Sequence, residues 1–252
     1  MRVAGLDIGS RSVELVVVDT ENGAIVHARE IPTGPRVADD CRALVEEARF
    51  ERLLATGYGR TLAEVSFGYP TVAEIKAYAR GAHAVLPGCR TVLDVGGQDT
   101  KVIALDAAGR ALRFEMNDRC AAGAGRFLEM IAVALQCDIG ALGPTALQGS
   151  PGTRISSMCA VFAESEVVGL MTKGSRREDI AWAAHDALVR RLVSQIMRVG
   201  GEPPVLFAGG AARNPCLRHL VAERTGRDLF VPPSPQMIGA LGAALLAAGR
   251  FD

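Results

Sequence analysis

Leu6-Asp7-Ile8-Gly9-Ser10-Arg11-Ser12 decides the fold, because a second stretch of the same plan, Leu93-Asp94-Val95-Gly96-Gly97-Gln98-Asp99, follows it along the chain. In both stretches a strand-like apolar run leads to an aspartate and then to a glycine-containing turn, after which a second strand-like run begins. The two aspartates lie about 87 residues apart, which is far longer than the period of a short solenoid repeat. We therefore interpret the chain as an internal duplication of one strand-turn-strand plan.

Outward from these two turns, the sequence pattern predicts an α/β fold. Asn22-Gly23 and Ala107-Ala108-Gly109 are hairpin signals between strand-like runs, and the first half has the order β-β-β-α-β. Strands are expected over 3–8, 13–19, 24–31, 53–56, 91–95, 100–105, 111–116, 205–208 and 229–230, and helices over 39–49, 71–83, a stretch that starts near 120, 160–171, 176–199, 213–225 and 236–248, with a Gly/Pro-rich connection over 138–153.

Composition excludes several classes of protein. The chain has 252 residues, of which 49% are hydrophobic and 22% charged, as in ordinary globular proteins. Its formal net charge is zero, so neither nucleic acid nor an anionic membrane is expected as a partner. We see no signal peptide and no apolar run of the ~18 residues that span a bilayer. Six scattered cysteines do not resemble a secreted disulfide framework, so a reducing cytoplasm is the expected location.

The two turns have the chemistry of a nucleotide site. Glycines at 9, 96 and 97 allow backbone N–H groups to curl around an anion, and the hydroxyls of Ser10 and Ser12 add donors. Asp7 and Asp94, each at a strand end, are suited to hold a hydrated Mg²⁺ between phosphates. One such turn occurs in many hairpins, but two at corresponding points, together with a later Gly209-Gly210 turn, favour a phosphate site.

This set of turns resembles the actin-like (ribonuclease H-like) ATPase superfamily, which includes sugar kinases, acetate kinase and heat-shock chaperones. The resemblance implies two actin-like domains with ATP or ADP in a cleft between them, the first formed by residues 1–65 plus 230–252 and the second by residues 66–229. It implies phosphate motifs at residues 7–12 and 94–99 and an adenosine motif at residues 207–212. Residues it places near the nucleotide are Gly209, Gly210, Ala211, Gln236 and Gly239, and Gln98 is a candidate to orient the attacking water, a structural amide being the alternative.

A second functional candidate is the stretch Asn117-Asp118-Arg119-Cys120-Ala121-Ala122-Gly123-Ala124-Gly125-Arg126-Phe127-Leu128. Two glycines at a helix start cost roughly 1 kcal/mol each relative to alanine, which suggests that something approaches the backbone there. Two interpretations stay open from these residues alone, a buried thiol before a frayed helix or a cysteine ligand at the positive end of a helix.

The same stretch narrows the resemblance to the ATP-dependent activators of 2-hydroxyacyl-CoA dehydratases and the related ATPase subunits of benzoyl-CoA reductase. Three further motifs agree in order along nearly the whole chain: residues 55–60, 96–99 and 157–166. The resemblance implies that Cys120 and Cys159 hold half of one [4Fe-4S] cluster, which a homodimer completes with four thiolates. It also implies an anaerobic electron donor that hydrolyses ATP, receives electrons from ferredoxin or flavodoxin, and passes them to an acyl-CoA dehydratase or reductase.

Other interpretations remain. A benzoyl-CoA-type or double-cluster reductase is the alternative acceptor, and an actin-like small-molecule kinase, such as an amino-sugar kinase, or a non-catalytic ATP-binding scaffold is the rival function. A zinc site at Cys120 and Cys159 lacks a second ligand pair. Cys41, Cys89, Cys137 and Cys216 are expected to be packing or surface thiols.

One position departs from the family pattern. Glu14 stands where many relatives carry lysine, and a carboxylate would repel phosphates. Either Glu14 points away from the nucleotide, or the first turn binds the phosphates differently. In the second case Arg11 would supply the positive charge in place of the lysine.

Overall fold

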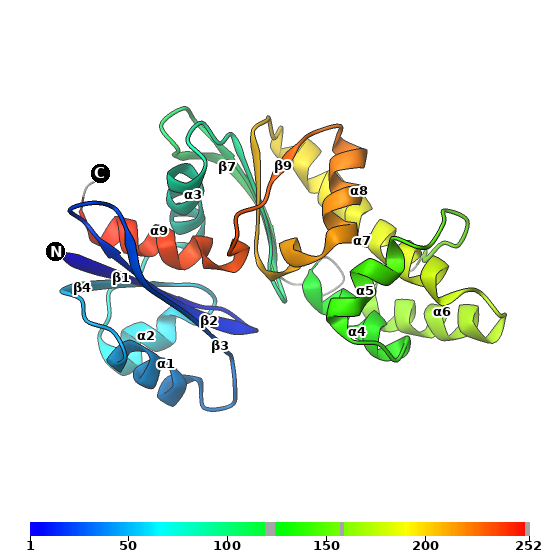
Figure 1. Ribbon diagram of the computed structural model, residues 1–252, viewed down its shortest axis with the longest axis horizontal. Helices are drawn as coiled ribbons and strands as arrows, with labels where there is room; N and C mark the ends of the chain where they lie inside the picture. The colour runs from blue at the N-terminus through cyan, green and yellow to red at the C-terminus, as the bar shows by residue number, and fades with distance from the viewer. Residues whose placement is uncertain (119–123, 157–158, 250–252) are drawn as a thin grey trace. The chain divides into compact units, whose positions relative to one another are not determined.

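The computed structural model describes residues 1–118, 124–156 and 159–249, and it is built on two β-sheets with helices around them (Figure 1). The first sheet has the strand order β3-β2-β1-β4 and the second β7-β6-β5-β8-β9. The strands are β1 (Arg2–Ile8), β2 (Ser12–Asp19), β3 (Ile25–Pro32), β4 (Arg52–Thr56), β5 (Thr91–Val95), β6 (Thr100–Leu105), β7 (Ala111–Asn117), β8 (Val205–Ala208) and β9 (Leu229–Phe230).

The helices alternate with the strands, as the α/β pattern predicts. They are α1 (Val37–Glu46), α2 (Arg60–Phe67), α3 (Glu74–Val85), α4 (Gly125–Ala134), α5 (Ile139–Ala146), α6 (Ala160–Thr172), α7 (Arg177–Val199), α8 (Pro215–Thr225) and α9 (Ile238–Ala247), with short 3-10 turns η2 (Gly210–Arg213) and η3 (Pro235–Met237). Within the described residues no single helix is long and apolar enough to cross a bilayer, and α4 with α5 passes that test only as a pair bent by 87°.

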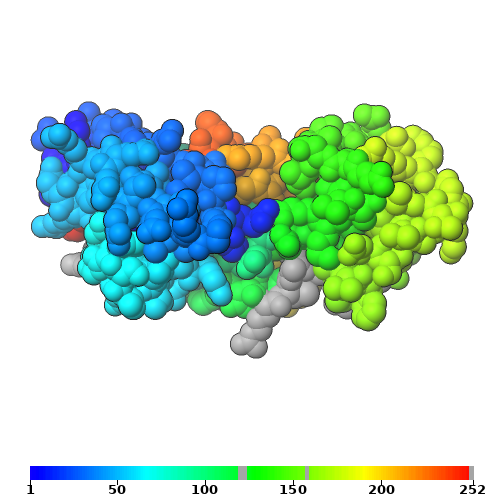
Figure 2. Space-filling model, turned by 90° about the horizontal axis from the view of Figure 1, so that it is seen from below, coloured from blue at the N-terminus to red at the C-terminus, as the bar shows by residue number. Residues whose placement is uncertain are grey.

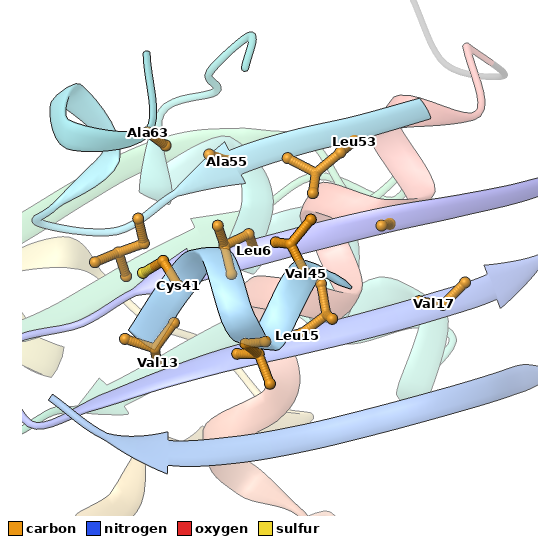
Figure 3. Close-up of a cluster of buried hydrophobic side chains, with 12 residues drawn as sticks. Leu6, Val13, Leu15, Val17, Cys41, Val45, Leu53, Ala55 and Ala63 are labelled. Carbon is orange, nitrogen blue, oxygen red and sulfur yellow. The ribbon is translucent and has the colours of Figure 1, made fainter. Parts of the chain in front are cut away.

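The first sheet is apolar on both faces, which explains the nearly continuous run of hydrophobic residues in β1 and β2. β1 pairs antiparallel with β2 and parallel with β4. Side chains on one face, including Leu6 and Leu15, pack with α1 residues such as Cys41 and Val45 (Figure 3). On the other face Val3, Val16 and Val18 pack against α9. Because strand side chains alternate, Asp7 and Glu14 share the α9 face with these valines.

The chain divides into two compact units by contacts. The first consists of Met1–Val92, Ile103–Phe114 and Pro232–Asp252, and the second of Leu93–Val102 and Glu115–Val231. The helices α1 and α2 lie at the surface of the first unit, and α4 to α6 at the surface of the second (Figure 2). The predicted division at residues 65 and 229 differs, since α3 packs closely on α9 and so falls in the first compact unit.

Two helices were not predicted. The first, α2, begins directly after Gly59 and is only eight residues long. The second, α5, lies inside the stretch predicted to be a connection and contains Gly140, Gly143 and Pro144, which are poor helix formers. Its start is nevertheless capped, because the Asp138 carboxylate accepts the Gly140 N–H at 2.7 Å. The prediction of an irregular connection over 138–153 was therefore wrong for α5.

Candidate functional site

The first predicted phosphate turn is a tight hairpin between β1 and β2. Gly9 N–H donates to the Ser12 carbonyl at 3.0 Å, which closes the turn. Asp7 is the last residue but one of β1 and pairs with Glu14, and each of these two residues is 4% exposed. The Ser12 hydroxyl, predicted to donate to phosphate, here donates to the Glu14 carboxylate. Ser10 and Arg11 form the tip of this turn, where Arg11 is exposed.

Gly239 of α9 lies directly against the Asp7 carboxylate. A Cβ at Gly239 would stand 2.0 Å from Asp7 Oδ2, so only glycine allows the helix to approach this closely. The Gln236 amide, one turn earlier, donates through Nε2 to Glu30 Oε2 at 3.0 Å on the neighbouring strand β3. The first unit therefore brings together the predicted residues Asp7, Gly239 and Gln236 around one turn.

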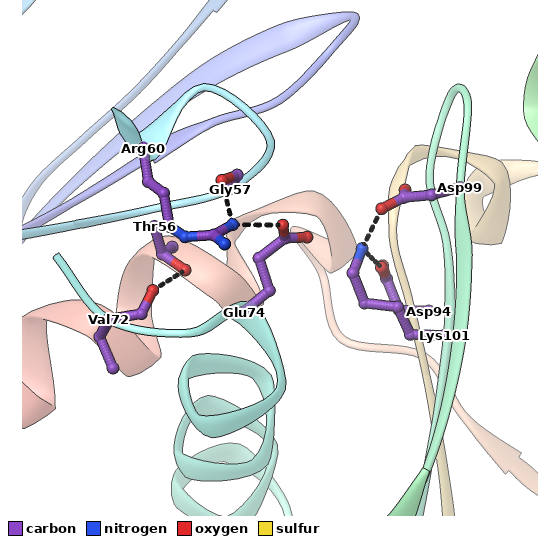
Figure 4. Close-up of polar contacts among 8 residues, drawn as sticks. All are labelled: Thr56, Gly57, Arg60, Val72, Glu74, Asp94, Asp99 and Lys101. Atoms are coloured by element: carbon purple, nitrogen blue, oxygen red, sulfur yellow. Dashed lines mark hydrogen bonds and ion pairs between the residues drawn. The ribbon is translucent and has the colours of Figure 1, made fainter. Parts of the chain in front are cut away.

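The second predicted phosphate turn repeats this hairpin. Gly96 N–H donates to the Asp99 carbonyl at 2.9 Å, as Gly9 does to Ser12. Asp94 is fully buried at the end of β5. The Lys101 ammonium lies 3.1 Å from Asp94 Oδ2 and 2.6 Å from Asp99 Oδ2, so it ties both ends of the turn together (Figure 4). The tip residue Gln98 is exposed.

The predicted adenosine turn lies against this second hairpin. Gly209 has a φ of +82°, and a Cβ there would meet the Val95 carbonyl at 2.4 Å and Asp94 Oδ1 at 2.6 Å. A side chain is thus excluded both by backbone conformation and by space. Next to it Gly210 is exposed, with no atom within 4 Å of the place a Cβ would take, and Ala211 is partly exposed. The second unit brings Asp94, Gly96 and Gly209 together.

The start of helix α4 is hydrogen-bonded to the second turn. Gly125 N–H donates to the Gly96 carbonyl at 2.9 Å, and Arg126 N–H donates to the Gly97 carbonyl at 2.7 Å. The first N–H groups of a helix have no partner inside the helix, so these turn carbonyls satisfy them. A Cβ at Gly125 would lie 3.0 Å from the Gly96 carbonyl oxygen. The glycine at 125 therefore has a close neighbour in the phosphate turn itself.

A buried histidine fixes the segment after the adenosine turn. His185 Nδ1 lies 2.7 Å from the Ala181 carbonyl and Nε2 lies 2.9 Å from Asn214 Nδ2, so the neutral ring donates through Nδ1 and accepts through Nε2. The Asn214 side-chain oxygen in turn accepts the Cys216 and Leu217 N–H groups and caps α8. Burial lowers the pKa of His185 to about 4.

The cysteines differ in what they can bind. Cys120 lies outside the described residues. Cys159 is exposed at the residue that precedes α6. Cys41 and Cys216 are buried within helices, as expected, and burial raises their pKa to about 11 and about 12, which keeps them as thiols. Cys137 is partly exposed and Cys89 is buried.

Among the described residues, side chains that could bind a metal ion are not grouped together. No group of three or more His, Cys, Asp or Glu side chains there is arranged to hold a metal ion. A Mg²⁺ that keeps most of its waters needs only one or two carboxylates, and the role of Asp7 and Asp94 in holding it through water stays a prediction.

Sequence reasoning missed Lys101. The signal was present, because Lys101 stands two residues after Asp99 as Glu14 stands two residues after Ser12. Aligning the two repeats position by position would have shown that a cation and an anion occupy equivalent places.

Comparisons with known proteins identify the family of the chain. The model of the BadF/BadG/BcrA/BcrD ATPase family matches residues 4–247. The chain is 38% identical over 256 residues to the 2-hydroxyisocaproyl-CoA dehydratase activator of Clostridioides difficile, covering 98% of this chain and 95% of that one. It is 30% identical over 268 residues to one of the subunits of benzoyl-CoA reductase from Thauera aromatica, covering 99% and 94%.

Comparison with solved structures supports the same family and gives the fold. The structure of that dehydratase activator with bound ADPNP superposes with a TM-score of 0.87 at 37% identity, covering 98% of this chain and 94% of the other. A ROK family glucokinase from Streptomyces griseus, only 15% identical with a TM-score of 0.62, shares the fold alone and marks it as actin-like. The duplicated hairpins, the full-length family match and the actin-like fold agree, and the chain belongs to the BadF/BadG/BcrA/BcrD ATPase family.

Proposed function

We propose that this protein is an ATP-hydrolysing one-electron donor that activates a 2-hydroxyacyl-CoA dehydratase. The observation that carries the proposal is that a relative named as a dehydratase activator matches nearly the whole chain. The duplicated phosphate turns support the ATPase part, because each places a glycine-containing turn directly after a buried aspartate.

ATP would lie in a cleft between two actin-like domains, residues 1–65 plus 230–252 and residues 66–229. In this proposal the turn with Gly9, Ser10 and Arg11 and the turn with Gly96 and Gly97 grip the phosphates, and Gly209 to Ala211 with Gln236 and Gly239 border the nucleoside. Asp7 and Asp94 hold the waters of Mg²⁺, and Gln98 orients the attacking water. The exposed position of Gln98 at the turn tip supports that role.

Cys120 and Cys159 would supply two of four thiolates, and a second copy of the chain the other two. A [4Fe-4S] cluster bound there would supply a single low-potential electron. The fit rests on Cys159, which is exposed and lies at the residue before α6, where helix N–H groups stabilise negative charge. Buried Cys41 and Cys216 are unsuited, since their raised pKa values disfavour the thiolate.

Hydrogen bonds between the second phosphate turn and the start of α4 support coupling between ATP hydrolysis and the segment that carries Cys120. Helix α4 follows the Cys120 segment in the chain, and its first two N–H groups bond to the carbonyls of the second phosphate turn. A change in that turn on ATP hydrolysis would therefore move the start of α4. Electrons would come from a ferredoxin or flavodoxin, and a reducing cytoplasm would keep the thiols free.

The decisive experiment is an anaerobic preparation analysed for iron, oligomer mass and ATP hydrolysis. We expect about four irons per dimer, because four thiolates complete one cluster. Cys159→Ser should lose the iron and the characteristic EPR signal of the reduced protein, whereas Cys137→Ser, at a partly exposed cysteine outside the proposed ligand set, should keep both. Full iron content in Cys159→Ser would contradict the ligand assignment, and an iron-free wild-type protein would contradict the electron-donor proposal.

A second candidate is an ATPase subunit of a benzoyl-CoA-type or double-cluster reductase, which the match to the benzoyl-CoA reductase of Thauera aromatica supports. The two candidates differ in the acceptor, so electron transfer from the reduced protein to a purified dehydratase or reductase separates them. The kinase alternative has less support, since the glucokinase shares only the fold. Sugar-dependent ATP turnover without iron would favour it.

A further inference from the structure

The segment that leads to Cys159 is hydrogen-bonded to two helices of the second unit. Ile155 is buried, with 1% of its surface exposed, and Ser156 follows it at the surface. Cys159 is the residue before α6, and its carbonyl accepts the Ala163 N–H at 2.9 Å. Three extended residues span at most about 11 Å, so whatever fixes Ser156 also limits where Cys159 can lie.

The first attachment is to Glu166 of α6, and we call the hydrogen bonds between Ser156 and Glu166 the Ser156 clamp. The Ser156 N–H donates to Glu166 Oε1 at 3.0 Å and Oε2 at 3.1 Å, and the Ser156 hydroxyl donates to Oε1 at 3.1 Å. Glu166 stands seven residues after Cys159, so both lie on the same face of the helix. The clamp therefore holds the incoming segment along the face of α6 that begins at the cysteine.

The second attachment is to α7. Arg190 Nη2 donates to the Ile155 carbonyl at 3.1 Å. Arg190 also pairs with Asp186, a buried carboxylate that pairs with Arg224 of α8 as well. Because the planar guanidinium has a fixed carboxylate partner, it binds the Ile155 carbonyl in a defined geometry. Ile155 is thus fixed independently of Glu166, and what Glu166 controls is the short stretch from Ser156 to Cys159.

We propose that Glu166 is a positioning residue that holds the segment before Cys159, so that this cysteine is in place as a ligand before the iron–sulfur cluster binds. A ligand that is already positioned loses little conformational entropy on binding, whereas a ligand on a free segment must first be ordered. The inference rests on the proposed cluster at Cys120 and Cys159, and it identifies the side chain that orients one of these ligands.

The test measures how fast an excess of iron chelator removes iron from the anaerobically prepared full-length protein. Glu166→Ala removes the acceptor oxygens of the Ser156 clamp. We expect it to lose iron about 10- to 100-fold faster than the wild type, the scale on which metal affinity falls when groups that orient metal ligands are removed. Glu166→Gln keeps one acceptor oxygen, so its rate should lie between those of the wild type and Glu166→Ala.

Two further variants isolate the clamp. Glu164→Ala removes a carboxylate from the same helix, and in the described part of the chain no hydrogen bond or ion pair involves that side chain, so it should release iron at the wild-type rate. Ser156→Ala removes only the hydroxyl bond and should accelerate release less than Glu166→Ala does. Combined with Glu166→Ala it should add nothing further, because the hydroxyl then has no acceptor on that residue.

A second measurement separates positioning from a structural role. If Glu166 orients the ligand, the EPR signal of the reduced protein should change shape in Glu166→Gln and Ser156→Ala. If Glu166→Ala only lowers the melting temperature of the iron-free protein, with wild-type iron release and EPR signal, Glu166 has a structural role and the inference is overturned.

The remaining outcomes are also decisive. If Glu166→Ala does not fold, as shown by circular dichroism, wild-type release rates in both Glu166→Gln and Ser156→Ala would overturn the inference, and faster release in both would support it. Wild-type protein that contains no iron would overturn the proposed function itself. Iron-loaded wild type together with wild-type release from Glu166→Ala would overturn this inference alone.

Discussion

The two phosphate turns have the same backbone hydrogen bond but carry side chains of opposite charge at one equivalent position, Glu14 and Lys101. In each, a glycine N–H bonds to the carbonyl three residues later, and a buried aspartate is the last residue but one of the first strand. At the equivalent position of the second strand the first turn has Glu14 and the second has Lys101. The Glu14 carboxylate accepts a hydrogen bond from the Ser12 hydroxyl, whereas the Lys101 ammonium donates to the carboxylates of Asp94 and Asp99.

This difference teaches that a duplicated backbone does not imply duplicated chemistry. In the first turn the Ser12 hydroxyl donates to the Glu14 carboxylate. In the second turn a buried cation lies within 3.1 Å of the strand-end aspartate. The residue at this equivalent position therefore engages a serine hydroxyl in the first turn and two carboxylates in the second.

The largest expected effect is a loss of unfolding free energy at low pH that arises in the second unit and not in the first. His185 and Asn214 fix α8 after the adenosine turn of the second unit, whereas α9 in the first unit begins without a side-chain cap. The folded pKa of His185 is about 4, below its ordinary value of 6.5, so the unfolded chain binds more protons between these values. Stability from this group is therefore complete above pH 6.5 and falls by up to roughly 3 kcal/mol as the pH drops to 4.

Urea unfolding at pH 7 and pH 5 measures this effect. His185→Gln should lose less stability than the wild type on acidification, because the titrating ring is gone. The control is His219→Gln on the exposed face of α8, which should behave as the wild type does. Equal acid loss in wild type and His185→Gln would show that His185 does not contribute.

The next effect tests whether the two strand-end aspartates act alike. If each holds Mg²⁺ through water, Asp7→Asn and Asp94→Asn should each lower the kcat of ATP hydrolysis by about 100-fold, the scale of metal-assisted charge stabilisation. Asp94→Asn should also loosen Lys101, so its melting temperature should fall further than that of Asp7→Asn. Unchanged ATPase activity in either variant would show that its aspartate does not take part in the reaction.

A third test disrupts the close contact between helix α9 and Asp7 in the first unit. Gly239→Ala places a Cβ 2.0 Å from Asp7 Oδ2, so we expect a loss of about 2 kcal/mol in unfolding free energy from overpacking. Gly210→Ala is the matched control in the second unit, because no atom lies within 4 Å of its new Cβ. Similar losses in both variants would mean that contact with Asp7 is not the cause.

The smallest effect comes from making the first turn resemble the second. Glu14→Lys places a cation opposite Asp7, as Lys101 is placed beside Asp94. We expect ATP to bind about tenfold more tightly in EDTA, because a positive charge replaces a negative one near the phosphates. Glu14→Gln, which removes only the negative charge, should give a smaller gain in affinity. Weaker binding in both variants would show that Glu14 supports the site.

Local patterns predicted most of the fold. The strands around both turns, the long helix α7 and the strand before Gly209 all lie within about two residues of their expected bounds. These elements have strong periodicity or clear turn residues. Helix α5 was missed because Gly143 and Pro144 disfavour a helix locally, and its packing against α7 and α8 overrides that preference.

The candidate site was predicted in part. The structure gathers Asp7 with Gly239, and Asp94 with Gly209, although more than a hundred residues separate each pair in the sequence. The repeated turns supplied Asp7, Asp94 and Gly209 and the resemblance supplied Gly239, while their contacts depend on how α9 and β8 pack. The spacing of the two repeats aligns Lys101 with Glu14, but only the folded hairpin shows that its partners are the carboxylates of Asp94 and Asp99.

By itself the sequence determined the repeated strand-turn-strand plan and the family, because both are recognised from short motifs whose residues are each contiguous in the chain. Only the tertiary structure decided that Ser12 donates to Glu14, that Lys101 ties Asp94 to Asp99, and that the start of α4 bonds to the second turn. The physical reason is that buried charges and helix N–H groups must find partners, and packing brings those partners from other elements.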